Sequence, residues 1–258
     1  MDYWQKQLAP LYRDLEWNFP EQKSGTVSII GGSRGSFASV IKLSESLGKY
    51  PIAQVKTFLP DSLAKDLPPL PGLTFLESTE SGSFAKSPGL NRALEQTDFT
   101  LLAGDLSKNS ATSIAVLEAL QQTDKPILLA RDAVDCICLG IAETIDDHDL
   151  FLFASMAQLQ KLFRTLFYPK MLMLSHPLLS IIETLHKFTL SYERITLITL
   201  HEGQIIVAHQ GKITTTPLAK TGFNVLSFFT GSLPADILAY NLWNPGKPLE
   251  ASSAALFH

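Results

Sequence analysis

The stretch Val27-Ser28-Ile29-Ile30-Gly31-Gly32-Ser33-Arg34-Gly35-Ser36-Phe37 decides the fold, because a short apolar run passes directly into a glycine-rich turn. A helical pattern follows the turn at residues 38–49. Such a strand–turn–helix unit is typical of doubly wound α/β domains. Glycines let the backbone come close to a ligand, and the unpaired N–H groups that open the next helix attract anions. The stretch therefore predicts an α/β domain that binds a mononucleotide.

The same turn has a second interpretation. Its spacing matches neither the dinucleotide fingerprint nor the P-loop, and many α/β domains use such glycines only for tight packing. Arg34 carries a fork that suits a phosphate, yet a surface salt bridge explains it equally well.

Further out, short apolar runs alternate with helical patterns. Strands are expected at 27–30, 53–58, 99–103, 127–130, 150–153 and 195–200, and helices at 38–49, 111–122, 156–167 and 177–188. Residues 205–208 and 212–216 flank a turn-like triplet and predict a hairpin. Uninterrupted apolar strands joined by helical crossovers indicate a mainly parallel sheet with helices on both faces. We expect one domain over 1–258, with residues 1–20 as a helical extension whose amphipathic helix covers 2–16.

Composition excludes several classes of function. The chain has 258 residues and a formal net charge of -4, with 45% hydrophobic and 18% charged residues. A nucleic-acid partner is disfavoured by this charge, and no apolar run is long enough for a membrane span. The two cysteines, Cys136 and Cys138, are expected to be buried thiols, and no metal site is predicted, with 146–149 expected to form a solvated turn. These features indicate a cytoplasmic protein.

Four passages carry a resemblance to a known family: Lys23 to Gly35, Asp98 to Leu106, Pro126 to Val134, and the order of elements from Gly211 to the C-terminus. Together they resemble the ADP/ATP-dependent NAD(P)H-hydrate dehydratases, which belong to the carbohydrate-kinase-like branch of the ribokinase-like superfamily. The resemblance spans nearly the whole chain and is most specific in the first passage. It implies a ribokinase-like three-layer sandwich, and a homo-oligomer with 251–257 at an interface or in the core.

The resemblance also assigns a site. Residues placed at the nucleotide or substrate site are Gly31, Gly32, Ser33, Arg34, Gly35, Gly104, Asp105, Thr221 and Gly222, with Asn224 and Asp132 as the catalytic candidates. Active members use ADP or ATP with Mg²⁺ to phosphorylate the hydroxyl of the hydrate and then eliminate phosphate.

This chain departs from the family pattern at three places. The late glycine turn that should end in a catalytic aspartate reads Thr221-Gly222-Phe223-Asn224, and a neutral amide is far too weak to serve as a base. A turn that should end in glutamate ends in Gln158 instead. A Lys-Gly strand end falls near His201-Glu202-Gly203, where a carboxylate would repel polyphosphate.

Three hypotheses follow from these departures. The chain is a divergent dehydratase-like protein with weakened or lost dehydration, in which Asp132 or Asp105 would have to supply the base. Alternatively, it is a non-catalytic or regulatory protein that binds a nucleotide or NAD(P)H-like ligand, or needs no cofactor at all. The third hypothesis is a kinase of the same fold for a sugar or vitamin alcohol, which requires the same missing aspartate.

Overall fold

One mixed sheet of ten strands organises the chain. The structure is a computed structural model that describes residues 2–68, 70–106, 109–138, 140–143, 145 and 148–258. The strands are β1 (Trp4–Lys6), β2 (Ser24–Gly31), β3 (Ile52–Pro60), β4 (Leu73–Leu76), β5 (Phe99–Ala103), β6 (Ile127–Ala130), β7 (Leu150–Phe153), β8 (Ile195–His201), β9 (Gln204–His209) and β10 (Lys212–Pro217). Their spatial order is β1-β10-β9-β8-β7-β6-β5-β2-β3-β4. Strand β9 runs antiparallel to β8 and β10, and the pairs from β8 to β4 are parallel.

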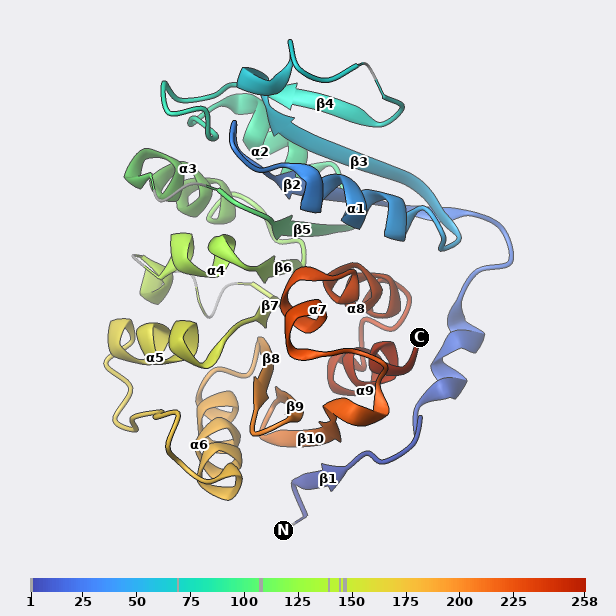
Figure 1. Ribbon diagram of the computed structural model, residues 1–258, viewed down its shortest axis with the longest axis vertical. Helices are drawn as coiled ribbons and strands as arrows, with labels where there is room; N and C mark the ends of the chain where they lie inside the picture. The colour runs from blue at the N-terminus through green and yellow to red at the C-terminus, as the bar shows by residue number, and fades with distance from the viewer. Residues whose placement is uncertain (1, 69, 107–108, 139, 144, 146–147) are drawn as a thin grey trace.

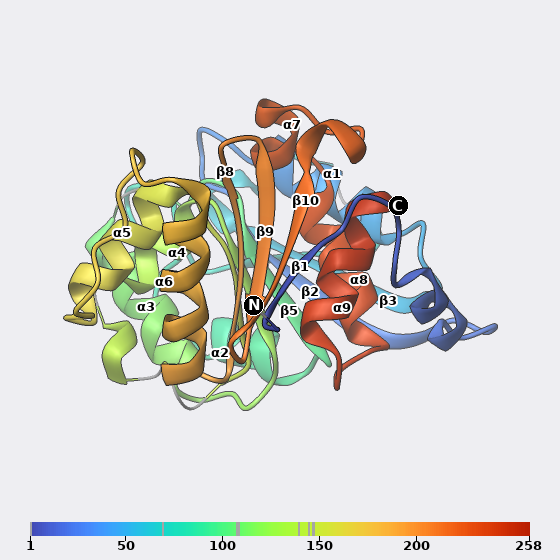
Figure 2. The ribbon, with the colours of Figure 1, turned by 90° about the horizontal axis from the view of Figure 1, so that it is seen from below.

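Helices cover both faces of this sheet, as Figures 1 and 2 show. One face carries α2 (Pro88–Glu95), α3 (Ser110–Leu120), α4 (Asp132–Ile137), α5 (Met156–Thr165) and α6 (Leu178–Ser191). The other carries α1 (Ala38–Leu47), α7 (Val225–Thr230), α8 (Leu233–Leu242) and α9 (Pro248–Ala254). Each face buries its own apolar cluster, so the chain forms the expected three-layer α/β sandwich.

The central strands are buried on both faces. Every residue of β5, β6 and β7 is buried, which explains why their sequences are apolar without alternation. Because they run parallel, their carboxyl ends meet at one edge of the sheet. Ligands of open α/β sheets bind outside this edge, so a ligand site of this chain is expected there.

The N-terminal prediction was wrong. In place of a helix over 2–16, residues 4–6 form strand β1 beside β10, and Arg13–Asn18 form a 3₁₀ helix, η1. Pro10 cannot donate to a helix and disfavours helical geometry at the residue before it, so an α-helix across this position is costly. Pairing with the open edge of β10 satisfies the backbone instead: the N–H of Gln7 donates to the carbonyl of Thr215 at 2.8 Å.

The C-terminal segment belongs to the core of its own chain. Ala251, Ala254, Ala255 and Leu256 are buried in the cluster that α8 and α9 form against the sheet. The interface alternative for 251–257 therefore fails for these four residues, whose side chains are already covered. In the part of the chain that the structure describes, no helix is both long and apolar enough to span a membrane.

Candidate functional site

The candidate site lies where β2, β5 and β6 end. Strand β2 leads into the glycine turn at Gly31, β5 leads into Gly104 and Asp105, and β6 ends just before Asp132. Since β2 pairs with β5 and β5 with β6, the structure brings these predicted residues to neighbouring strand ends. Helix α7, which follows the turn 221–224, packs over the end of β7 through the ring contact described below.

Three of the predicted glycines are required for internal packing. A Cβ on Gly31 would lie 1.6 Å from the carbonyl oxygen of Ala103 on the neighbouring strand. Gly32 and Gly104 have positive φ angles of +87° and +88°, which L side chains rarely adopt. A Cβ on Gly104 would also meet Val40 of α1 at 2.8 Å. The packing interpretation of the first turn therefore accounts for these glycines without any ligand.

Of the remaining turn residues, Ser33 is buried and Arg34 and Gly35 are exposed. Ser33 and Ser36 close the turn with two backbone hydrogen bonds of 3.0 Å. Arg34 is exposed, its N–H donates to the carbonyl of Gly82 at 3.1 Å, and its aliphatic stem covers Gly82. Arg34 forms no ion pair with the residues that the structure describes, so the salt-bridge alternative is wrong within them. Nothing lies within 4 Å of a Cβ placed on Gly35.

Two carboxyl groups meet at the ends of β5 and β6. The side chain of Asp132 is hydrogen-bonded to that of Asp105. Burial, together with the hydrogen bond and the charge of Asp105, raises the pKa of Asp132, and the neighbouring Arg131 opposes the shift only in part. Asp132 is therefore the titratable group that the site offers as an acid or base.

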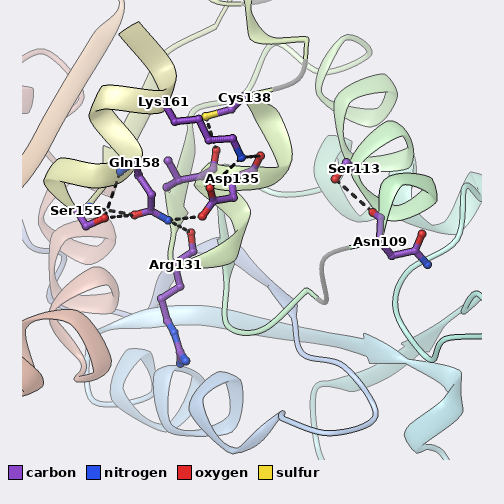
Figure 3. A network of polar contacts seen from close by, with 9 residues as sticks. Asn109, Ser113, Arg131, Asp135, Cys138, Ser155, Gln158 and Lys161 are labelled. Carbon is purple, nitrogen blue, oxygen red and sulfur yellow. Dashed lines mark hydrogen bonds and ion pairs between the residues drawn. The ribbon is translucent and has the colours of Figure 1, made fainter. Parts of the chain in front are cut away.

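The backbone just before Asp132 is strained. Arg131 has φ +58° and ψ −129°, which is a conformation that only glycine adopts readily. Figure 3 shows what holds it: the carbonyl of Arg131 accepts a hydrogen bond of 2.8 Å from the Nε2 group of Gln158. The guanidinium of Arg131 points away from this network.

The amide group of Gln158 has a structural role as a hydrogen-bond donor, which a glutamate at this position could not fill. Its Nε2 group also donates to Asp135 at 2.8 Å, and Asp135 forms an ion pair of 3.0 Å with Lys161. Its oxygen accepts from the N–H and the hydroxyl of Ser155, which completes the capping box of α5. A carboxylate at 158 would keep the acceptor but lose both donated bonds and would face Asp135.

The turn at 221–224 uses its polar groups internally. The N–H of Phe223 donates to the hydroxyl of Thr221, and the N–H of Asn224 donates to the hydroxyl of Ser227 at 2.9 Å. The amide oxygen of Asn224 accepts from the N–H of Ser227 at 2.8 Å, so the side chain is the N-cap of α7. Gly222 is exposed, with φ +75° and open space around it. Two donors that could have formed part of an anion hole, the N–H groups of Phe223 and Asn224, are therefore already paired.

An aromatic cluster fills the space between α7 and the sheet. The ring of Phe228 lies 4.7 Å from that of Phe153, the last residue of β7, and 4.9 Å from that of Phe229. Both Phe153 and Phe228 are buried. Sequence reasoning missed this contact and the role of Ser227; the paired aromatics Phe228-Phe229 were the available signal, but their partner on β7 is visible only in three dimensions.

The strand end at His201 serves the fold. His201 is buried, and its Nε2 atom lies 2.8 Å from the carbonyl oxygen of His176. Glu202 is exposed and adopts φ +48° in the hairpin turn with Gly203. Both residues are therefore engaged in connecting β8 to its neighbours.

Only part of the acidic segment 146–149 belongs to the described residues. Asp146 and Asp147 lie outside them, and Asp149 forms an ion pair of 2.9 Å with Arg194. Within the described residues no group of three or more metal-binding side chains comes together. Both cysteines are buried and free, as expected.

Comparison with known proteins separates fold from chemistry. No protein-family model and no curated protein sequence matches the chain. A solved structure of a ribokinase-like superfamily protein from Enterococcus faecalis matches with a TM-score of 0.66, at 13% identity, over 100% of this chain and 86% of the other. The fold is ribokinase-like.

Two further structures extend the likeness. A hypothetical protein from Streptococcus mutans matches the ribokinase-like fold of this chain with a TM-score of 0.68, at 15% identity, over 97% of this chain and 87% of that protein. The ADP/ATP-dependent NAD(P)H-hydrate dehydratase of Bacillus subtilis, co-crystallised with ATP and Mg²⁺ and soaked with CoA, matches with a TM-score of 0.64 at 16% identity, over 97% and 86%. At such identities the likeness establishes the fold alone, so the chemistry must be argued from the site.

Proposed function

We propose that this chain is a divergent NAD(P)H-hydrate dehydratase-like protein that has lost ADP- or ATP-dependent dehydration. One observation carries the proposal: the turn at 221–224 binds its own donors, and its amide oxygen caps α7. An amide oxygen cannot accept a proton from a hydroxyl at neutral pH, and a paired N–H cannot stabilise a phosphoryl group without first breaking its bond.

The Bacillus subtilis dehydratase was crystallised with ATP and Mg²⁺, and two features of this chain support the loss of such a ligand. Phe223 packs its side chain against the core cluster of α8 and α9, where a bare backbone would admit phosphate oxygens. Glu202 adds negative charge at a strand end of the same sheet edge. The residues therefore support loss of nucleotide binding together with loss of the base.

The direct test measures binding and turnover separately. Calorimetry with ADP–Mg²⁺ and with ATP–Mg²⁺ is expected to show no micromolar affinity, and a coupled absorbance assay with hydrated NADH is expected to show no dehydration. Micromolar nucleotide affinity or measurable dehydration by the unaltered chain would contradict the proposal.

A substitution series tests why activity is absent. Asn224→Asp alone is expected to restore no dehydration, because Ser227 still occupies the N–H of residue 224 and Phe223 still blocks the turn. Asn224→Asp combined with Ser227→Ala and Phe223→Gly is the matched variant that frees the donors. Recovery by the single change would show that a missing base is the whole defect.

A second candidate function is binding without turnover at the carboxyl pair. The observation that favours it is the juxtaposition of Asp105 and Asp132 beside the strained Arg131, an arrangement that costs stability and is typical of ligand sites. A thermal-shift screen with nucleotides, hydrated cofactors and sugars tests it, since a ligand that binds the folded state raises its melting temperature. A shift that Asp132→Asn abolishes would assign the ligand to this pair.

A further inference from the structure

A pocket of about 270 Å³ opens at the edge of the sheet opposite the candidate site. The amino ends of the central strands form one side of it, and the connection from α8 to α9 forms the other. Figure 2 shows this connection at the lower end of the strands and α7 at the upper end. The pocket is therefore separate from the carboxyl pair, and its position does not follow from the rule that places ligands at the carboxyl ends of parallel strands.

The walls of the pocket are apolar and flat. Phe99 on β5 and Phe151 on β7 are both buried, and their ring centroids lie 5.2 Å apart. Three proline rings, those of Pro126, Pro245 and Pro248, line the pocket with them. Such walls favour a planar ligand, and the volume is small for a ligand site, so it suits a molecule of one or two rings.

Asn241 gives the pocket a hydrogen-bond acceptor. Its side chain lines the pocket and is 2% exposed. The Nδ2 group donates to the carbonyl of Ile237 at 2.8 Å and to the hydroxyl of Ser252 at 3.0 Å. A carbonyl oxygen only accepts, so these bonds determine which end of the amide is the nitrogen. The Oδ1 atom is buried and has no partner among the described residues, which costs free energy until a donor reaches it.

His209, at the end of β9, supplies a second acceptor. Its Nδ1 atom lies 3.3 Å from the carbonyl oxygen of Ile195 and 3.1 Å from the hydroxyl of Thr196. Because the carbonyl only accepts, Nδ1 carries the proton in the neutral ring and Nε2 presents a lone pair. Burial lowers the pKa of His209, and the hydrogen bond to Ile195 opposes this shift, so the ring is neutral at pH 7.

The charged side chains of the pocket offer no surplus positive charge. Two of the residues that line it are acidic, Asp149 and Glu193, and one is basic, Arg194. Arg194 forms an ion pair of 2.9 Å with Asp149, which leaves the carboxylate of Glu193 beside this pair. An anionic ligand is therefore disfavoured, and hydrogen bonding to the two acceptors decides what the pocket recognises.

We propose that this pocket binds a small aromatic heterocycle with at least two N–H donors, one for Oδ1 of Asn241 and one for Nε2 of His209. Free aminated bases such as adenine belong to this class. Nucleotides do not, because their ribose replaces the N–H at N9 and their phosphates add negative charge. The assignment is therefore independent of the loss of ADP- or ATP-dependent dehydration.

Titration of the unaltered chain with three matched bases tests the donor requirement. Adenine, which has an amino group and an N9–H, is expected to bind with a dissociation constant of about 1 mM or tighter. Purine lacks the amino group and 9-methyladenine lacks the N9–H, so each leaves one acceptor unpaired and should bind about tenfold more weakly. Equal affinity for all three bases, or no binding of adenine, would overturn the proposal.

Nitrogen NMR of the histidine rings tests the location without altering the chain. The Nε2 resonance of His209 should move as adenine saturates the protein, because the nitrogen then accepts a hydrogen bond. Adenine binding that leaves this resonance in place would assign the base to another site and contradict the proposal.

A pair of matched variants checks the same point. His209→Phe keeps a ring of similar size but removes the acceptor, and should weaken adenine binding about tenfold. His186→Phe is the control: it loses a comparable contact of Nδ1 with the carbonyl of Gly211 on α6, on the other face of the sheet, and should leave adenine affinity unchanged. Thermal melts establish that both variants are folded. If His209→Phe binds adenine as tightly as His186→Phe does, then His209 is not part of the site and the proposal fails.

Discussion

At the scale of single residues, Asp132 opposes folding at neutral pH. Its pKa is raised in the folded chain by burial and by Asp105, so the folded state binds its proton more tightly than the unfolded state does. The resulting stabilisation is complete below the unfolded value of about 3.9 and is lost as pH rises through the raised pKa of the folded state. Asp132→Asn should therefore melt at a higher temperature than the unaltered chain at pH 7.

The pH dependence checks this explanation. The advantage of Asp132→Asn should shrink as pH falls toward about 4, because protonation of Asp132 in the unaltered chain then removes the same repulsion. Asp135→Asn is the control: it removes the smallest of the charges that raise the pKa of Asp132 but gives up the ion pair with Lys161, so it should show no net gain. Equal melting temperatures of Asp132→Asn and the unaltered chain at pH 7 would mean that the charge of Asp132 does not destabilise the folded state.

At the scale of elements, Gln158 joins α5 to the start of α4. Gln158→Glu should destabilise the protein by about 2 kcal/mol, because the carbonyl of Arg131 and the carboxylate of Asp135 lose their donor. For a chain of this size the loss corresponds to a fall in melting temperature of roughly 4–8 °C. Calorimetric melting at neutral pH measures it.

A matched variant separates hydrogen bonding from charge. Ala157→Glu adds the same charge one residue earlier, at an exposed position in the first turn of α5, and should leave the melting temperature nearly unchanged. If both variants melt alike, then the amide of Gln158 contributes no stability as a donor.

The sequence predicted those strands and helices whose limits are visible in their own pattern of apolar residues. Strands β5, β6 and β7 have the bounds that their apolar runs indicated, since a doubly buried strand shows its limits in its own sequence. Helices α2, α4 and α8 and strand β4 were not predicted. Helix α4 has only six residues, which is too short to show a helical periodicity. Its N-cap residue is Arg131, which has a positive φ and forms no side-chain cap, so the usual N-cap signal is missing from the sequence.

The candidate site was predictable only in part. Strand order follows from the alternation of elements, so the ends of β2, β5 and β6 could be expected at one edge. The pairing of individual donors and acceptors could not be predicted. The N–H of Ser227, for example, donates to the amide oxygen of Asn224, although solvent or a ligand could have taken either group. The contact between Phe153 and Phe228 joins residues far apart in sequence and depends on how α7 docks.

At the scale of the whole molecule, β1 closes one end of the ten-strand sheet. Its removal would leave β10 as an open edge whose N–H and C=O groups could pair with another chain. Deletion of residues 1–7 also removes the bond of 2.9 Å from the Trp4 indole to Thr215 and the bond of 3.2 Å from the buried Gln7 side chain to the carbonyl of Ser253.

The deletion should therefore lower the melting temperature and, on heating, produce aggregates that light scattering detects. Gln7→Ala isolates one part of the effect: it keeps the strand but leaves the carbonyl of Ser253 without its donor, at a cost of about 1–3 kcal/mol. That variant should melt earlier yet remain monodisperse, because the edge of β10 stays covered. Lys6→Ala, an exposed change in the same strand that gives up only the contact of its ammonium group with the Trp4 ring, should alter both properties far less. If the deletion melts no earlier than Lys6→Ala, then β10 is stable as an edge and the N-terminal strand is dispensable to the sheet.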